Sequence, residues 1–262
     1  MTRVAYLGHP GAYAHRAACC LLPGAEARGE PTPAAAVAAV LAGGAAAAVL
    51  PVENRYGGPV AGAAELLADH GLCVGADVWL PIRHVLAAFP GTSWYSVRHV
   101  LSHPQALAQC APYLAAHGMR AEARDSTSDA AREVAARRRP DLAALCSPDA
   151  AQLYGLEVVA HRVTAIADNR TRFWLLRREP APAHPAPSRF TAVVGPVQSA
   201  GSVHALLAEM RQAGMTVTRI LPLAAGRLLI DGAGDPLRVP PLRGPAPARV
   251  HWYPRHRGPR GA

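Results

Sequence analysis

Short apolar runs alternate with alanine-rich segments over the first two thirds of the chain, which predicts strands alternating with helices. The first set comprises expected strands at residues 4–7 and 46–51 and expected helices at residues 12–22, 33–42 and 60–70. A second set begins after Leu80-Pro81, with expected strands at residues 97–101 and 141–146 and helices at 105–117, 127–138 and 148–154. Strands that alternate with helices form open α/β sheets, so the break between the sets predicts two α/β lobes.

A further segment, residues 166–176, follows the second set and is expected to return the chain to the first lobe. Its apolar strand begins at Phe173, and the polar residues Thr171 and Arg172 directly precede it. In two-lobed α/β folds, ligand-binding clefts form where the chain crosses from one lobe to the other. We therefore expect Thr171 and Arg172 to lie at a cleft between the lobes.

A proline and alanine run at residues 179–188 separates the two lobes from a smaller domain. Proline cannot donate to a sheet and stiffens the chain, so this run is predicted to be a linker. The pattern that follows is strand 190–195, helix 202–214, strand 217–223 and strand 227–231. This order resembles the first half of an ACT domain, a small βαββαβ ligand-sensing module.

The remainder departs from that module, because residues 232–247 hold too many glycines and prolines for a full second helix. Residues 249–254 could supply a closing strand. The predicted organisation is two lobes over residues 1–178, a linker over 179–188, a truncated ACT-like domain over 189–254 and a disordered basic tail over 255–262.

The net charge of +9 would suit a nucleic-acid partner, but the rest of the composition argues against one. All 27 residues counted as lysine or arginine are arginine, and aromatic residues make up only 5% of the chain. No basic stripe is interleaved with stacking rings, so nucleic-acid binding is not predicted. No apolar run is long enough to span a bilayer, and we expect a cytoplasmic protein without a membrane partner.

The five cysteines form an odd number and have neither disulfide-framework nor metal-ligand spacing, so they are expected to be reduced packing residues. The glycine loop at residues 8–11 is too short for a phosphate or dinucleotide fingerprint. The sequence therefore predicts neither a metal ion nor a cofactor.

Five separated motifs occur in the order found in prephenate dehydratases. They lie at residues 8–13, 50–54, 102–110, 125–127 and 168–173. The chain therefore resembles that family, including its plant arogenate dehydratase branch, from about Val4 to Leu176. The resemblance implies a two-lobed α/β catalytic domain like that of periplasmic binding proteins, with a smaller α+β, ACT-like C-terminal domain.

The resemblance also implies a carbon–oxygen lyase that removes carbon dioxide and water from prephenate to give phenylpyruvate in L-phenylalanine biosynthesis. It implies a small-molecule substrate, no cofactor, and a homodimer or larger homo-oligomer. Three alternatives remain: an arogenate dehydratase, a prephenate decarboxylase of specialised metabolism, and a non-catalytic small-molecule binder. The related decarboxylases are expected to lack the acid threonine, and a pure binder needs no proton donor, so Thr171 argues against both.

Thr171 is the predicted proton donor to the departing ring hydroxyl, a general-acid role worth roughly 10²- to 10⁴-fold in rate. Threonine is a poor acid in water, so its contribution would come from orientation in a closed cleft. Arg172 is predicted to pair with a substrate carboxylate, because a guanidinium offers a planar fork and keeps its charge. The neighbouring Phe173 completes this part of the predicted substrate site.

Further predicted substrate-binding residues follow a strand or begin a helix. Asn54 ends an apolar strand and is well placed to donate amide hydrogen bonds. The other candidates lie at expected helix starts: Gly11, Ala12, Ser102, Gln105, Ser126 and Thr127. Free N–H groups at helix starts attract anions, but serine and threonine at such positions can equally act only as helix caps.

Three positions depart from the family's usual pattern. Arg55 stands where a serine usually follows the asparagine, and Ala14 stands where a serine is common. Arg55 could recruit an extra carboxylate or block the pocket. Apolar residues at 221–225 replace a Glu-Ser-Arg-Pro segment that usually serves phenylalanine, so inhibition by phenylalanine is not expected.

Overall fold

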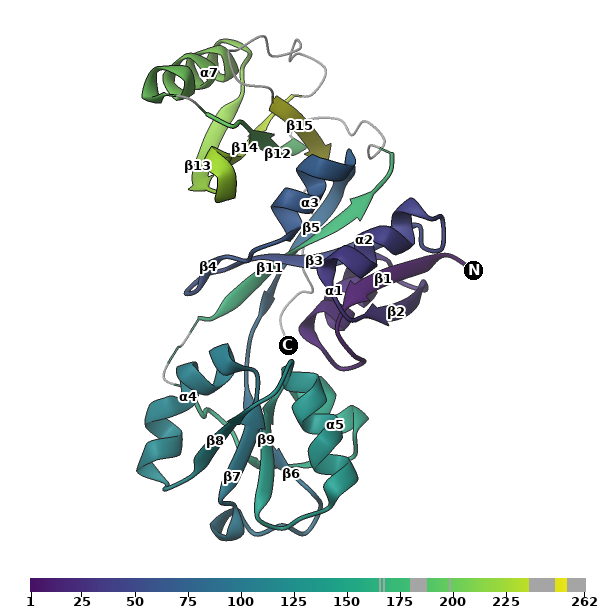
Figure 1. The fold of residues 1–262 in the computed structure, drawn as a ribbon, viewed down its shortest axis with the longest axis vertical. Coiled ribbons are helices and arrows are strands. Elements are labelled where there is room, and N and C mark those ends of the chain that lie inside the picture. The colour runs from purple at the N-terminus through teal and green to yellow at the C-terminus, as the bar shows by residue number, and fades with distance from the viewer. Residues whose placement is uncertain (165, 167, 180–187, 198, 236–247, 254–262) are drawn as a thin grey trace.

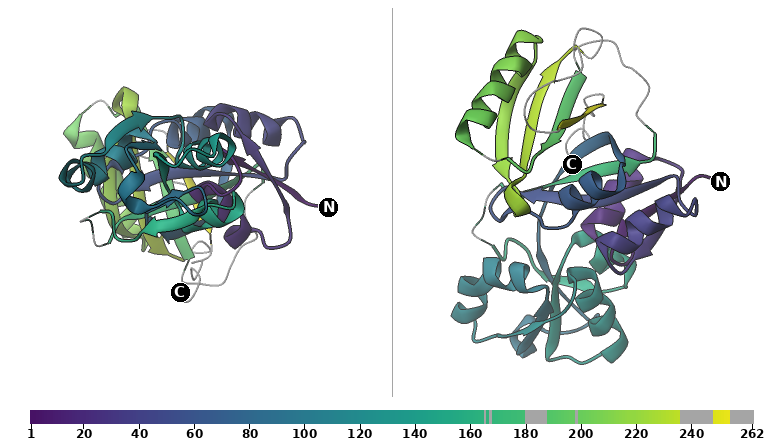
Figure 2. Two further views of the ribbon diagram at one scale, coloured as in Figure 1. Left: turned by 90° about the horizontal axis from the view of Figure 1, so that it is seen from below. Right: turned by 45° about the horizontal axis from the view of Figure 1, so that its top comes forward.

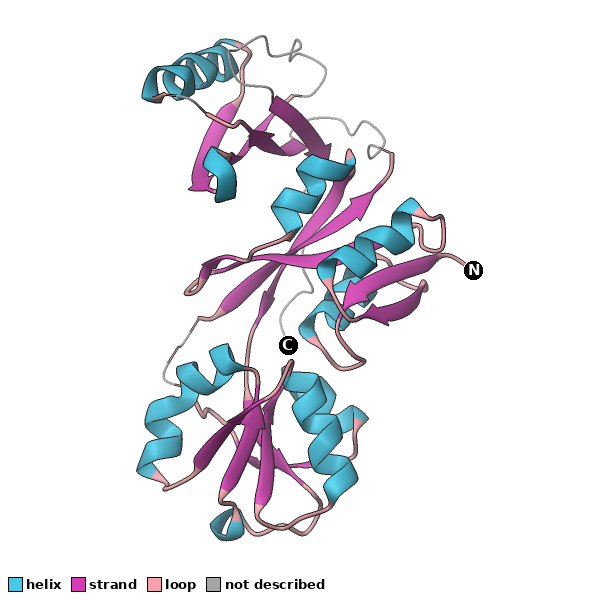
Figure 3. Cartoon of the chain, in the orientation of Figure 1, coloured by secondary structure: helices cyan, strands magenta, loops and turns pink. Residues whose placement is uncertain are grey.

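The computed structural model describes residues 1–262 except 165, 167, 180–187, 198, 236–247 and 254–262. Three sheets follow one another along the long axis of the molecule (Figure 1). The sheet of the first lobe lies in the middle, between the second lobe and the C-terminal domain, and the right-hand view of Figure 2 shows the same succession. The helices lie on the faces of these sheets (Figure 3).

The sheet of the first lobe has the order β2 (Glu26–Glu30), β1 (Arg3–Leu7), β3 (Ala47–Asn54), β11 (Arg170–Arg177) and β5 (Cys73–Pro81), with β4 (Gly58–Pro59) paired to β3. Strand β1 is parallel to β2 and β3, whereas β11 is antiparallel to β3 and β5. Helix α1 (Tyr13–Leu21) packs on one face, and α2 (Pro33–Leu41) and α3 (Ala63–His70) pack on the other.

The second lobe has the sheet order β10 (Glu157–Ala160), β6 (Val85–Ala88), β9 (Leu142–Cys146), β7 (His99–Ser102) and β8 (Arg120–Ala123). Its helices are η1 (Trp94–Ser96), α4 (Pro104–Ala116), α5 (Thr127–Arg137) and α6 (Pro148–Leu153). The chain enters this lobe after β5 and leaves it before β11. These two crossings join the lobes, so β11 lies where the sequence predicts a return to the first lobe.

Residue chemistry fixes the starts of the second-lobe helices. Ser126 and Ser147 cap α5 and α6, and each side-chain oxygen accepts a backbone N–H at 3.0 Å. Pro104 and Pro148 occupy first-turn positions, where a missing N–H costs nothing and the fixed φ suits a helix. The starts of α4 and α5 also contribute residues to the cavity described below.

The C-terminal domain is an antiparallel sheet of order β13 (Thr216–Pro222), β14 (Leu228–Gly234), β12 (Ser188–Val194) and β15 (Ala248–Tyr253), with helix α7 (Ala200–Gln212) and the short η2 (Ala224–Gly226). The element order and pairings are consistent with the expected ACT-like fold. Most of the region without an expected second helix, 236–247, lies outside the described residues. Most of the predicted linker and the basic tail also lie outside them.

Every helix expected from the sequence is present with small shifts of its ends. Five strands of four or more residues were not predicted from the sequence: β2, β5, β6, β8 and β10. Strands β2 and β8 are short and polar and lie at sheet edges. They are stabilised by pairing with one neighbouring strand, so they have no apolar run that would predict them from the sequence. No helix in the described part of the chain combines the length and apolar character that a membrane crossing requires.

Candidate active site

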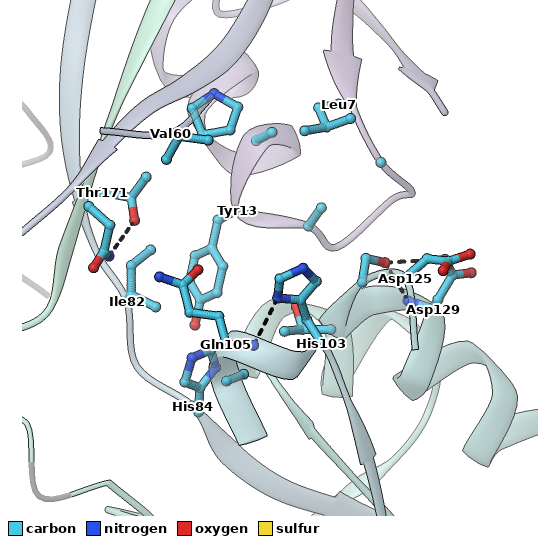
Figure 4. A pocket seen from close by; sticks show the side chains of 18 of the residues that line it. Leu7, Tyr13, Val60, Ile82, His84, His103, Gln105, Asp125, Asp129 and Thr171 are labelled. Carbon is cyan, nitrogen blue, oxygen red and sulfur yellow. Dashed lines mark hydrogen bonds between the residues drawn. The ribbon is translucent and has the colours of Figure 1, made fainter. Parts of the chain in front are cut away.

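A cavity of about 410 Å³ lies between the two lobes, a size suited to a small organic substrate (Figure 4). Both lobes contribute side chains to it. Its lining consists of Leu7, Gly8, His9, Ala12, Tyr13, Ala14, Pro31, Pro51, Asn54, Val60, Ile82, His84, His103, Gln105, Ala106, Gln109, Asp125, Ser126, Thr127, Asp129, Asn169, Thr171 and Phe173. Seven predicted substrate-site residues are among them: Thr171, Phe173, Asn54, Gln105, Ser126, Thr127 and Ala12.

Thr171 is held at the cavity wall by Asn54, its partner on the neighbouring strand. The Asn54 amide Nδ2 donates to Thr171 Oγ1 at 3.0 Å and to Asn169 Oδ1 at 2.8 Å. Its Oδ1 accepts the backbone N–H groups of Tyr56 at 3.0 Å and Gly57 at 2.8 Å, which fixes the orientation of the amide. Because Thr171 Oγ1 accepts from Asn54, its own O–H remains available to donate into the cavity.

The same polar network crosses the cleft. Asn169 Nδ2 donates to Gln109 Oε1 at 3.0 Å, which connects the β11 end of the site to helix α4 of the second lobe. Asn54 therefore has its hydrogen-bonding capacity occupied by protein groups. This arrangement makes Asn54 a residue that orients Thr171, in addition to lining the cavity.

Three helix N-termini converge on the cavity. The N-cap residues Ala12 of α1, His103 of α4 and Ser126 of α5 all line it. Helix starts carry unpaired N–H groups and a partial positive charge, so they attract carboxylates. Among the described lining residues there is no arginine, which leaves these helix starts as the main anion-attracting groups.

Two histidines of the cavity are held in the neutral form. Burial lowers the pKa of His84 to about 4, and a side-chain hydrogen bond with Gln109 offsets only part of this effect. Burial also lowers the pKa of His103, against an opposing contribution from Asp125. The Nδ1 of His103 accepts the Gln105 N–H at 3.2 Å, as an unprotonated ring nitrogen does. Neither ring therefore supplies a positive charge near neutral pH.

The lobes contact each other beside the cavity through the loop before α1. Ser147 Oγ donates to the carbonyl of Gly11 at 2.8 Å, and Tyr154 Oη donates to the carbonyl of Pro10 at 3.0 Å. Gly11 has φ +84°, and a Cβ there would approach Ala150 Cα at 2.8 Å. Gly11 was predicted to bind substrate, but it does not line the cavity. It lies against α6 and permits the close approach of the lobes.

Arg172 does not lie in the cavity, contrary to its predicted role as a substrate clamp. Its side chain is 1% exposed and pairs with Asp77 and Asp231 on the opposite side of the sheet. Successive side chains on a strand point to opposite faces, so Thr171 and Arg172 cannot both face the substrate. Their adjacency in the sequence therefore places them on opposite sides of β11.

Ser102 is also excluded from a direct role, because it is fully buried and its Oγ donates to the Leu145 carbonyl at 2.6 Å. Arg55 neither fills nor lines the cavity, and its guanidinium pairs with Asp168. The other unusual position, Ala14, does line the cavity.

Several lining residues were not predicted from the sequence, among them His84 and Gln109. Gln109 lies four residues after Gln105, and residues at this spacing share one face of a helix, so that spacing offered a signal. His84 offered none, because its isolated position after the first lobe says nothing about which cavity it faces. Asn169 lies within a noted motif, but its link to Gln109 spans 60 residues of sequence.

Comparison with known proteins identifies the family of this chain. Residues 4–181 match the family model described as prephenate dehydratase. The chain belongs to the prephenate dehydratase family. Arogenate dehydratase 1 from Petunia hybrida is 38% identical to it over 221 residues, which are 83% of this chain and 52% of that protein. The chain thus spans about half the length of the first curated relatives it matches.

Two solved structures can be superposed on almost the whole of this prephenate dehydratase family member. Prephenate dehydratase from Arthrobacter aurescens, in complex with L-Phe, is 25% identical with a TM-score of 0.82, over 97% of this chain and 90% of that chain. GqqA, described as a novel type of quorum quenching acylase, is 28% identical with a TM-score of 0.83, over 97% of this chain and 98% of that chain. The fold is therefore two α/β lobes like those of periplasmic binding proteins, followed by an ACT-like domain.

Proposed function

We propose that this protein is a carbon–oxygen lyase that dehydrates and decarboxylates prephenate to phenylpyruvate in L-phenylalanine biosynthesis. The observation that carries the proposal is the Thr171 hydroxyl. It lies at the wall of an interlobe cavity, and Asn54 donates to its oxygen at 3.0 Å so that its proton is left for a ligand. Arogenate is the alternative substrate, because the curated relatives include proteins named for arogenate dehydration.

The chemistry needs little from the protein beyond binding and one hydrogen-bond donor. The ring carbon–oxygen bond breaks with its electron pair on oxygen, while the bond to the ring carboxylate breaks and its pair enters the ring. Carbon dioxide and water leave, and the ring becomes aromatic. Thr171 donates the proton that the departing oxygen takes up, and the threonine recovers a proton from solvent water. A hydrogen bond that strengthens as charge develops lowers the barrier selectively.

The two carboxylates of prephenate would be held by the helix starts. Ser126 and Thr127 begin α5, and Ala12 precedes α1, so backbone N–H groups of two lobes approach the ligand from different sides. Gln105 adds an amide from the first turn of α4. Neutral N–H donors suit this role because they remain unchanged in charge across the working pH range.

The cavity supports a dehydratase better than the other activities considered. A prephenate decarboxylase that keeps the ring non-aromatic would have no use for the Thr171 donor, and neither would a simple binder. Acyl transfer by a side-chain nucleophile would require a base to take the proton of the attacking hydroxyl. In the described residues Thr171 Oγ1 instead accepts a hydrogen bond from Asn54, which does not activate it as a nucleophile.

The test is to incubate the purified protein with prephenate and, separately, with arogenate at neutral pH. Products are identified by ultraviolet absorbance in alkali and by mass. Phenylpyruvate from prephenate supports the main proposal, and phenylalanine from arogenate supports the alternative substrate. A decarboxylated, non-aromatic product would select the decarboxylase activity, and two unchanged substrates would refute dehydration.

We further propose that the protein acts in the cytoplasm as a homodimer or larger homo-oligomer and that residues 189–254 form a truncated ACT-like regulatory domain. Strand β13 ends within the apolar segment that replaces the usual phenylalanine-binding residues. Leu221 and Leu223 pack against a hydrophobic cluster that combines first-lobe residues with Val193, Leu229 and Tyr253 of the C-terminal sheet, so they belong to the contact region between the domains. This packing supports the expectation that phenylalanine does not inhibit the enzyme.

A further inference from the structure

A buried polar cluster joins the strand that carries Thr171 to the C-terminal sheet. Arg172 Nε donates to Asp77 Oδ2 at 2.7 Å within the first lobe. On the other side its guanidinium pairs with Asp231 and donates to Tyr253 Oη at 2.7 Å. Thr191 completes the cluster, since its Oγ1 donates to Asp231 Oδ1 at 2.7 Å and lies 2.7 Å from Tyr253 Oη.

The central residues of the cluster are almost completely buried. Arg172 is 1% exposed, Asp77 is 2% exposed and Asp231 is 4% exposed. Arg189 Nη1 lies 3.4 Å from Asp77 Oδ2, so two guanidinium groups face two carboxylates. A buried charge that loses its partner is strongly unfavourable, and the hydrogen-bond geometry of such a cluster is demanding. The C-terminal sheet can therefore dock on β11 in few ways.

The register of the strands connects this cluster directly to the cavity. Thr171 is the cross-strand partner of Asn54, and the next pair along the ladder is Arg172 with Glu53. On the C-terminal sheet, Arg219 of β13 and Asp231 of β14 are likewise cross-strand neighbours. Two ion pairs join these neighbours across the domain boundary, Arg172 with Asp231 and Glu53 with Arg219. The two domains thus contact each other one ladder position away from Thr171 and Asn54.

The β11–β3 ladder is irregular at this point, because its register shifts between Arg172 and Phe173. A bulge disrupts the ladder hydrogen bonds and changes the direction of nearby side chains. On the β3 side, backbone pairing therefore fixes the orientation of Thr171 less firmly than in a regular ladder, whereas the β11–β5 pairing stays in register from Arg170 to Leu175. The side chain of Arg172 supplies an additional anchor one residue away.

We propose that Asp231 and Tyr253 are positioning residues for the dehydratase reaction, acting through Arg172 on the orientation of Thr171. This inference rests on the proposed function and deepens it. No described residue of the C-terminal sheet lines the cavity. The sheet instead contacts β11 on the face opposite Thr171, through Arg172. Repacking of that sheet would then change the rate of the chemical step more than substrate affinity.

The test compares Asp231→Asn and Tyr253→Phe with Asp69→Asn. The first two keep shape and remove a charge or a hydroxyl. The control removes the Arg227–Asp69 bridge, which also joins the domains but is 26% and 52% exposed and does not touch β11. We expect kcat to fall about 10- to 100-fold in Asp231→Asn with KM nearly unchanged, because small misplacements near the reacting atoms have effects of this size. Asp69→Asn should match the wild type.

Two further measurements separate positioning from a general loss of structure. Introducing Asp231→Asn into a Thr171→Ala background should cause little additional loss of kcat, since the two act as one unit. Amide hydrogen exchange of the segment 168–176 should be faster in both Asp231→Asn and Tyr253→Phe than in Asp69→Asn. Tyr253→Phe leaves every charge paired. If Asp231→Asn does not fold, the kcat and the hydrogen exchange of Tyr253→Phe decide the test.

Unchanged kcat in a folded Asp231→Asn protein and in Tyr253→Phe would overturn the inference, as would a full additional loss of kcat in the Thr171→Ala background. Unchanged exchange of the segment 168–176 in both variants would also overturn it. If the wild type converts neither prephenate nor arogenate, the proposed function fails. The exchange experiment then still decides whether the C-terminal sheet orders β11.

Discussion

Replacing Thr171 with valine tests the proposed reaction most directly, because valine keeps the volume and removes only the hydroxyl. If the hydroxyl acts as the general acid, kcat should fall by roughly 10²- to 10⁴-fold, which corresponds to about 2.7–5.5 kcal/mol of transition-state stabilisation. Ligand binding should change much less, because the helix starts that attract the carboxylates remain in place.

The structure predicts that this substitution changes stability little. Asn54 Nδ2 loses Thr171 as an acceptor but keeps Asn169 Oδ1 at 2.8 Å and the Arg170 carbonyl at 3.3 Å. One lost hydrogen bond with its donor still partnered costs about 0.5–1.5 kcal/mol. Such a change lowers Tm by only a few degrees in a protein of this size. A large loss of rate should therefore accompany a small loss of stability.

The assay follows phenylpyruvate formation from prephenate, or phenylalanine formation from arogenate, for wild type, Thr171→Val and Thr171→Ser. Thr171→Ser is the matched control, since it retains a hydroxyl at the same position and should keep much of the rate. The reasoning is refuted if a folded Thr171→Val protein has a kcat within about threefold of wild type. It is also refuted if the serine variant loses as much rate as the valine variant.

Three other expectations follow from the same structure. Gly11→Ala should raise KM, because its Cβ would approach Ala150 Cα at 2.8 Å at a positive φ and hinder lobe contact; an unchanged KM contradicts this. Phenylalanine should not inhibit turnover, and strong inhibition at low concentration in a titration of activity would show that the apolar segment near Leu221 still supports binding. In the folded protein the pKa of His84 is about 4, below the ordinary value of 6.5. The unfolded chain therefore takes up the proton first, and the free energy of unfolding falls as the pH drops from 6.5 towards 4. At 1.36 kcal/mol per pH unit this loss is roughly 3 kcal/mol. Denaturant unfolding of His84→Gln should show a weaker pH dependence than the wild type, and an equal dependence would contradict the assignment.

Much of the fold followed from local patterns in the sequence. Apolar runs such as residues 4–7 and 141–146 became strands β1 and β9, and the alanine-rich segments became helices near their predicted ends. Local signals suffice there because burial of an apolar run and capping of a helix involve only neighbouring residues. The polar edge strands β2 and β8 were missed because only their partners in the sheet stabilise them.

The candidate site was predicted in part, for a related reason. Motifs identified Thr171 and Asn54, and the structure brings both to one cavity although 117 residues separate them. Arg172 was assigned to the wrong side of the sheet, even though the alternation of side chains along a strand was already available as an argument. His84 and Gln109 join the site only because the lobes fold against each other.

The sequence by itself determined the family and the alternation of strands and helices, and it singled out Thr171 as the candidate proton donor. Only the tertiary structure decided what Arg172 does, because its partners Asp231 and Tyr253 are 59 and 81 residues away along the chain. From the sequence alone, the guanidinium next to the Thr171 hydroxyl could lie on either face of the strand, because the groups that neutralise it are distant along the chain. In this protein those groups are Asp77 on the first-lobe strand β5 and Asp231 on the C-terminal sheet, and together they offset the cost of burying the charge.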